Sequence, residues 1–114
     1  MSEKVDLNFI EDQDVSEEFT STIIYMPWRI ASIAFQGVSV GNPNGKLSVE
    51  IAIMEDQWET LKGCEEIAED LLIDKTFYFI LPNIGDYGSK LRLKWKPRAE
   101  SSGELSVAYR LMPW

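Results

Sequence analysis

The sequence predicts an all-β fold, an antiparallel β-sandwich of jelly-roll-like topology with about seven or eight strands. Three observations lead to this prediction. Apolar and polar residues alternate over several short stretches, which is the period of strands that bury one face. Clusters of Gly, Pro, Asn and Ser separate these stretches. The spacing typical of an amphipathic helix is confined to residues 62–73, where we expect one short helix or, in its place, an irregular acidic loop that ends in a strand.

The N-terminal segment, residues 1–18, differs from the rest of the chain in its charge. Val5, Leu7 and Phe9 alternate with polar residues, and an acidic run follows from Glu11 to Glu18. We therefore expect an acidic N-terminal arm or edge strand in 1–18, with the acidic run as a loop. Residues 19–114 are expected to form a single β-sandwich domain, because this length suits one domain with its own core.

Residues 30–54 are predicted to form a β-hairpin. Ile30 to Val40 and Lys46 to Met54 alternate as strands, and the intervening residues combine glycine, asparagine and proline in a turn signal. Further strands are expected where β-branched and aromatic residues are enriched, at Phe19–Tyr25, around Trp58 and at Thr76–Leu81.

The most informative stretch runs from Lys90 to Arg98. Its apolar side chains, those of Leu91, Leu93 and Trp95, would face the core, while cations alternate with them on the other face. A row of exposed cations in an acidic protein is a candidate contact surface for an anionic partner. The same row is also typical of an edge strand, where lysines discourage unwanted strand pairing.

A short internal repeat links two parts of the chain. Gly45–Val49 reads Gly-Lys-Leu-Ser-Val, and Gly103–Val107 reads Gly-Glu-Leu-Ser-Val. The second copy begins the last expected strand, Glu104–Leu111, so that residues 90–111 would form a second hairpin of equal length. We expect the two hairpins to be the two sides of a sandwich with Greek-key character, related by duplication or by convergence.

The net charge of the chain, −8 over 114 residues, argues against several partners. General binding to nucleic acid or to an anionic membrane is not expected, because phosphate would be repelled. No apolar run approaches the ~18 residues of a membrane span, and the N-terminus lacks the apolar region of a secretory signal. The single cysteine, Cys64, fits synthesis in a reducing cytoplasm. Acid is concentrated in 1–18 and 55–74 and base in 90–98, which would favour head-to-tail packing of copies.

The residue types argue against an enzyme. The chain contains no histidine, which removes the commonest general base and the usual zinc ligand. Cys64 therefore lacks the partner of a thiol nucleophile and is expected in the core. Glu11–Asp14 lacks the glycine and distal glutamate of an EF-hand loop, and Gly41–Gly45 lacks the Lys-Ser/Thr ending of a phosphate loop. We expect no catalytic residues, no metal ligands and no cofactor.

Tryptophan and tyrosine are abundant, with four residues of each. Exposed aromatic rings stack on sugars in carbohydrate-binding sandwiches, and they are also enriched at protein interfaces. Trp28 and Trp114 each follow a proline outside the predicted strands, so both are candidate contact residues. A carbohydrate-binding module is the alternative function, and its candidate stacking residues are Trp28, Trp58 and Tyr87.

Four strand and turn motifs follow one another along the chain. They are the turn and strand at Asn42–Glu50, Trp58 followed by Leu61, the strand with Leu91-Arg92-Leu93, and the closing turn and strand at Ser101–Val107. In this order of features the chain resembles a class of small phage virion proteins, over about four-fifths of its length. Two segments depart from the pattern of that class: Met54–Gln57, where the class reads Ser-x-Asp-Gly, and the acidic residues 62–74. The resemblance implies a non-enzymatic sandwich that forms or decorates a capsid, spike or tail.

We therefore expect a structural virion protein that acts by self-assembly and protein–protein contacts. Its partners would be other virion proteins or further copies of itself in a homo-oligomer. It would be located in the virion after synthesis in the host cytoplasm. The interface candidates are Lys90, Arg92, Lys94, Lys96, Arg98, Trp28 and Trp114.

Overall fold

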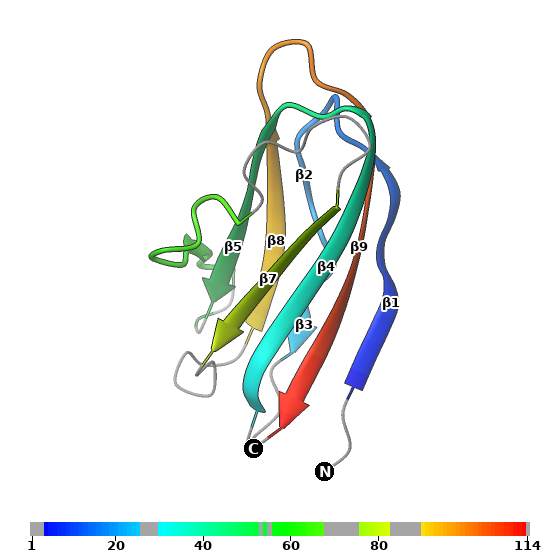
Figure 1. Ribbon diagram of the computed structural model, residues 1–114. Helices are drawn as coiled ribbons and strands as arrows, with labels where there is room; N and C mark the ends of the chain where they lie inside the picture. Colours follow the sequence, from blue (N-terminus) through cyan, green and yellow to red (C-terminus); the bar gives the residue numbers. More distant parts are fainter. Residues whose placement is uncertain are drawn as a thin grey trace.

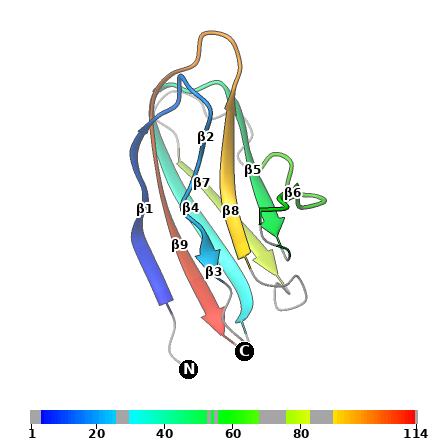
Figure 2. The same ribbon diagram turned by 180° about the vertical axis from the view of Figure 1, so that it is seen from behind.

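The structure is a computed structural model that describes residues 4–25, 30–52, 54, 56–67, 76–82 and 90–113. These residues form strands joined by turns and bends, with no helix among them. The strands build two antiparallel sheets that stack face to face (Figure 1 and, from behind, Figure 2). The prediction of an all-β sandwich is confirmed, and the described residues form nine strands where seven or eight were expected.

The two sheets differ in size and in the length of their strands. Sheet A has four long strands, in the order β1 (Lys4–Asp14), β9 (Ser102–Pro113), β4 (Ile30–Asn42) and β7 (Thr76–Pro82). Sheet B has the order β2 (Phe19–Thr20), β8 (Lys90–Pro97), β5 (Gly45–Ala52) and β6 (Glu59–Thr60), and β3 (Ile24–Tyr25) also pairs with β8. The single strand predicted at Phe19–Tyr25 is therefore two short strands on one edge of β8.

The core lies between the inner faces of the two sheets. Because successive side chains of a strand point to opposite faces, every second residue of the central strands is buried. Fully burying one such side chain contributes about 1.5–3 kcal/mol to folding, so these residues dominate the stability of the sandwich. The largest fully buried side chains are those of Ile33, Phe35, Leu105, Val107 and Leu111 from sheet A and Leu47, Val49, Leu91, Leu93 and Trp95 from sheet B.

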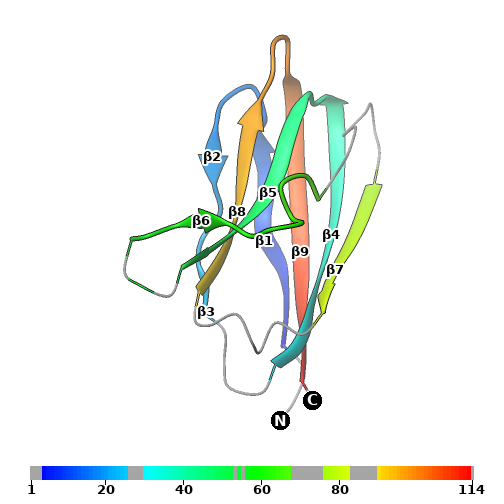
Figure 3. The ribbon, with the colours of Figure 1, turned by 90° about the vertical axis from the view of Figure 1, so that its left-hand side faces the viewer.

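The hairpins predicted for residues 30–54 and 90–111 are both wrong, because the two strands of each lie in different sheets. β4 pairs with β7 and β9 in sheet A, whereas β5 pairs with β6 and β8 in sheet B. The turn between β4 and β5 thus carries the chain from one sheet to the other, and the turn between β8 and β9 carries it back (Figure 3). Alternating side chains look the same in a hairpin and in two strands that face each other across a core, so the pattern could not separate the two arrangements.

The two crossing turns lie against each other at one end of the sandwich. The backbone N–H of Arg98 donates to Asn44 O at 2.8 Å, and the backbone N–H of Asn44 donates to Ser101 Oγ at 3.0 Å. Gly41 and Gly103 face each other here with φ angles of 91° and 107°, a conformation that favours glycine. The repeated segments that begin at Gly45 and Gly103 therefore occupy equivalent places, each starting the strand after a crossing turn.

The N-terminal segment is part of the sandwich. β1 forms an edge of sheet A and pairs with β9, and it extends through the first half of the acidic run that was expected to be a loop. Register shifts in β1 let the adjacent residues Phe9 and Ile10 both enter the core. Val15, just after β1, is fully buried, and its carbonyl oxygen accepts hydrogen bonds from Trp95 Nε1 at 2.9 Å and Ser101 Oγ at 2.8 Å.

Residues 62–67 form turns and bends, so the helix expected near 62–73 is absent from this described part, and residues 68–73 lie outside it. Cys64 and Ile67 are buried, as their apolar character implies. Their backbone groups bond to β5 rather than to each other: Val49 N–H donates to Cys64 O at 3.0 Å, and Ile67 N–H donates to Leu47 O at 2.8 Å. The segment lies along β5, and its hydrogen bonds to β5 replace those that a helix would form within itself.

Candidate interaction surfaces

The outer face of sheet B carries the predicted row of cations. Leu91, Leu93 and Trp95 are buried, and the alternate side chains of β8 point outwards as expected. β8 is a central strand, however, with β5 on one side and β2 and β3 on the other. The interpretation of the lysines as protection of a sheet edge is therefore wrong. The cationic face is defined by Lys46, Lys90, Arg92, Lys94 and Lys96.

Arg92 is occupied by neighbours on its own sheet. Its Nε lies 2.7 Å from Oε1 of Glu50, the residue opposite it on β5, and the Glu50 side chain is only 8% exposed. Above the pair, the ring of Trp58 covers the guanidinium, with Arg92 Cζ 4.1 Å from the ring centroid. Lys90 Nζ lies 5.9 Å from the same ring. Arg92 therefore holds the β5–β8 pair and the Trp58 loop together.

Trp58 and Arg98, two further predicted contact residues, also make contacts within the chain. One face of the Trp58 ring is covered by Arg92, so that face is closed to a sugar. Arg98 follows β8 and lies near the acidic segment, with Nη2 3.9 Å from Glu66 Oε1 and about half of its side chain exposed. Trp28, Tyr87 and Trp114 lie outside the described residues.

The outer face of sheet A exposes several large apolar side chains among polar ones such as Gln36, Ser106 and Arg110, a feature that the sequence did not predict. We call the apolar face the set of large side chains that point away from the core on β1, β4 and β7. Each of them is 44–73% exposed to solvent. Exposed apolar side chains gathered on one sheet face are often functional and mark a site of contact with another molecule. The set comprises Val5, Leu7, Val38, Val40, Tyr78 and Ile80.

A signal for this face was present in the sequence. β7 contains no charged residue, and it directs apolar side chains to both sides of the sheet, with Phe77 and Phe79 half-buried against the core and Tyr78 and Ile80 exposed. A strand with one solvated face normally alternates apolar and polar residues. The nearly continuous apolar run at Thr76–Pro82 therefore indicates a strand whose outer face, like its inner one, makes apolar contacts.

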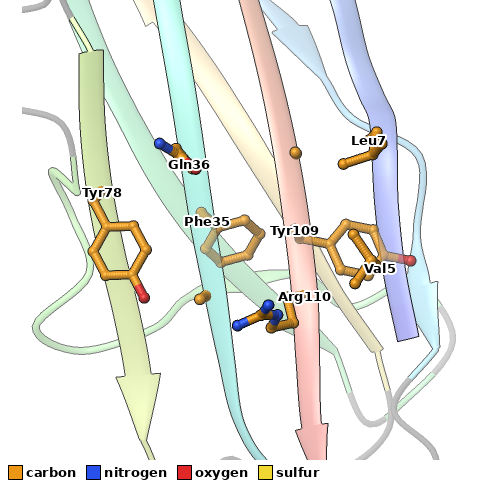
Figure 4. A pocket seen from close by; sticks show the side chains of 9 residues that line it. Val5, Leu7, Phe35, Gln36, Tyr78, Tyr109 and Arg110 are labelled. Carbon is orange, nitrogen blue, oxygen red and sulfur yellow. The ribbon is translucent and has the colours of Figure 1, made fainter. Parts of the chain in front are cut away.

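Two shallow grooves of about 250 Å³ each cross the apolar face. Both are lined by Leu7, Gln36 and Ala108, so they form neighbouring parts of one surface that spans all four strands of sheet A. Figure 4 shows the first groove, with Tyr78 on one side, Val5 and Leu7 on the other and Arg110 near its middle. The floor includes Tyr109, whose phenol has a raised pKa chiefly because of burial and then because of the nearby Asp6 carboxylate.

Charged groups mark the two ends of the apolar face with opposite signs. Arg110 on β9 lies toward one end, and Glu104, six residues earlier on the same face of β9, lies at the other. Asp12 lies closer to the middle of the face, beside Ser106, because its backbone N–H donates to Ser106 Oγ at 3.0 Å. The apolar face therefore has a direction, with base at one end of β9 and acid at the other.

Groups for catalysis are sparse in the part of the chain that the structure describes. No cluster of three or more acidic or cysteine side chains is arranged there to hold a metal ion. Cys64 is buried, and burial raises the pKa of its thiol, with a further contribution from the Glu65 carboxylate. No helix long and apolar enough to cross a bilayer is found among the described residues.

Comparison with known proteins adds no further constraint. No protein-family model, no curated protein and no solved structure matches the chain. The two outer faces of the sandwich are therefore the features of the chain that bear on its function.

Proposed function

We propose that this chain is a non-enzymatic structural subunit that works by assembling with proteins, as in the phage virion components that its motif order resembles. The observation that carries the proposal is the apolar face. A solvated sheet face would carry polar side chains, whereas this one exposes six large apolar ones across three strands.

The rigidity of the sandwich supports the same function. The apolar face is built on long, paired strands, β4 and β9 above all, which pair over twelve residue positions. Side chains on such strands are held in place before a partner arrives, which lowers the entropy that association must overcome. A preformed surface with only shallow grooves suits contact with another folded protein better than it suits a small ligand.

The solution mass of the purified chain tests this function. We expect light scattering to give a mass above that of the 13.1 kDa monomer, rising to a defined value as protein concentration increases. A strict monomer up to millimolar concentration would contradict self-assembly. Recovery of the chain in purified virus particles, at a copy number that suits a symmetric shell or tail, tests the virion setting.

A further inference from the structure

We infer that the apolar face of sheet A pairs with the apolar face of a second copy of this chain, in a two-fold dimer whose β9 strands cross in opposite directions. This inference rests on the proposed function and names its first contact. The partner is a second copy because three features of the face agree with self-pairing: its area, the placement of its charges and its neutrality within an acidic molecule.

The area of the face reaches the lower limit for a specific dimer. Adjacent strands lie ~4.8 Å apart, and each residue advances a strand by ~3.4 Å. Four strands over about eight residues therefore give a face on the order of 500 Å². Two copies would together bury on the order of 1,000 Å², which is the lower limit for a specific interface. Two sheets packed in this way interdigitate their side chains, and the two grooves can accept side chains of the second copy.

The charges select the orientation. A two-fold axis that lies in the interface and crosses the strands near Val107 reverses the direction of one β9 relative to the other. Arg110 of each copy then faces the acidic end of its partner, where Glu104 lies. A two-fold axis along the strands would instead place like charges together, which costs free energy at an interface. The reversed orientation also forms the favourable contact twice, as an isologous interface requires.

The neutrality of the face explains why two acidic chains can meet there. Each copy has a net charge of −8, so most approaches between copies are repulsive. The six side chains that define the apolar face carry no charge. Arg110, which lies among them, and Glu104, at the other end of the face, have opposite signs. Salt screens the long-range repulsion, so dimerisation through this face should hold or strengthen as salt is added. Association through the cationic face would weaken instead.

The decisive experiment compares two lysine substitutions by sedimentation velocity. Val38→Lys places a charge in the apolar face, at a residue that is 44% exposed and therefore tolerates lysine without unfolding. Thr20→Lys is the matched control, an exposed strand residue of sheet B. We expect Val38→Lys to raise the dimer Kd about 100-fold, because burying an uncompensated charge is costly, and Thr20→Lys to leave it within about twofold. Urea unfolding of both variants verifies that the fold is kept.

A charge exchange tests the orientation. We expect Arg110→Glu to weaken the dimer about tenfold and the double variant Arg110→Glu/Glu104→Arg to restore it, because each pair then recovers opposite signs. If the wild-type chain associates but Val38→Lys has no effect, the inference is overturned while the assembly function stands. If Val38→Lys dissociates the dimer but the double variant does not recover, the reversed orientation is overturned. If the wild-type chain is a monomer, self-assembly fails, and the dimer with it.

Discussion

Glu50 and Arg92 face each other across β5 and β8 on the outer surface of sheet B, with Oε1 and Nε 2.7 Å apart under the ring of Trp58. Charged residues on a solvated sheet face usually contribute little to stability. This pair differs because Glu50 is almost completely covered and because its partner also stacks on an aromatic ring. It holds the loop after β5 against the sheet and removes Arg92 from the cations that are available to a partner.

Replacing Glu50 should therefore destabilise the fold. We expect Glu50→Ala to lower the free energy of unfolding by about 2–3 kcal/mol, because the guanidinium of Arg92 is left without its carboxylate. Glu50→Gln keeps an acceptor of the same shape and should cost about 1 kcal/mol. Urea denaturation of both variants, together with Arg92→Ala and the double variant, measures the coupling between the two residues. A coupling energy near zero would show that the pair is only a surface contact.

Gly103 should not tolerate a side chain. Its φ of 107° disfavours other residues, and a Cβ at this position would overlap the carbonyl oxygen of Val40. Gly63 is the matched control, since its φ is 88° but nothing lies within 4 Å of a Cβ there. We expect Gly63→Ala to cost about 1–2 kcal/mol from backbone strain alone. Gly103→Ala should cost more than about 3 kcal/mol, because the two crossing turns must separate. Equal costs in thermal or urea unfolding would refute the close approach.

Lys94 and Lys96 test the cationic face without disturbing the fold, because no hydrogen bond or ion pair of either lysine side chain is described in the structure. If assembly uses the apolar face, Lys94→Glu/Lys96→Glu should leave the dimer Kd within about threefold, since exposed charges distant from an interface act only through screened fields. Light scattering at low and high salt measures this. Loss of assembly in the double variant, together with weakening of the wild-type assembly by salt, would instead assign the contact to the cationic face.

Cys64 should be unreactive in the folded protein. The thiol is 3% exposed, and burial followed by the Glu65 charge raises its pKa, so less thiolate forms at pH 8 than in a free cysteine. We expect a thiol-specific disulfide reagent to label it at the rate of unfolding, and rapidly in urea. Because the folded state holds this proton more tightly, the free energy of unfolding should decline as pH rises from the ordinary thiol pKa toward the raised one. The Cys64→Ser variant should lack that decline, and labelling as fast in buffer as in urea would contradict the burial.

The alternation of residues was sufficient to predict the inside and the outside of the central strands. In β8, Leu91, Leu93 and Trp95 are buried and the residues between them face outwards, because a period of two admits only two faces. The same rule failed in β1, where register shifts turn the neighbours Phe9 and Ile10 to the same side. A bulge changes which residues of a strand face the core, and the sequence carries no clear signal of that change.

The candidate site was predicted only in part. The cations of β8 lie where they were expected, yet Arg92 is committed to Glu50 and Trp58, which are distant in sequence. The apolar face was not predicted, because its residues come from three strands and lie on one surface only when β1, β9, β4 and β7 are side by side. The apolar run of β7 around Tyr78 was a partial signal, whereas Val38 looks like an ordinary strand residue until the sheet places both on one exposed surface.

The sequence by itself determined the all-β class, the approximate extent of most strands and the side of each central strand that faces the core. These properties depend on local backbone geometry and on the removal of apolar side chains from water, both of which act over a few residues. Only the tertiary structure decided which strands pair. The crossing turns at Asn44 and Ser101 send consecutive strands to opposite sheets, and long-range hydrogen bonds then join β4 to β9 and β5 to β8. Pairing depends on contacts between residues far apart in the chain, and so the surfaces that pairing creates could be seen only in the folded molecule.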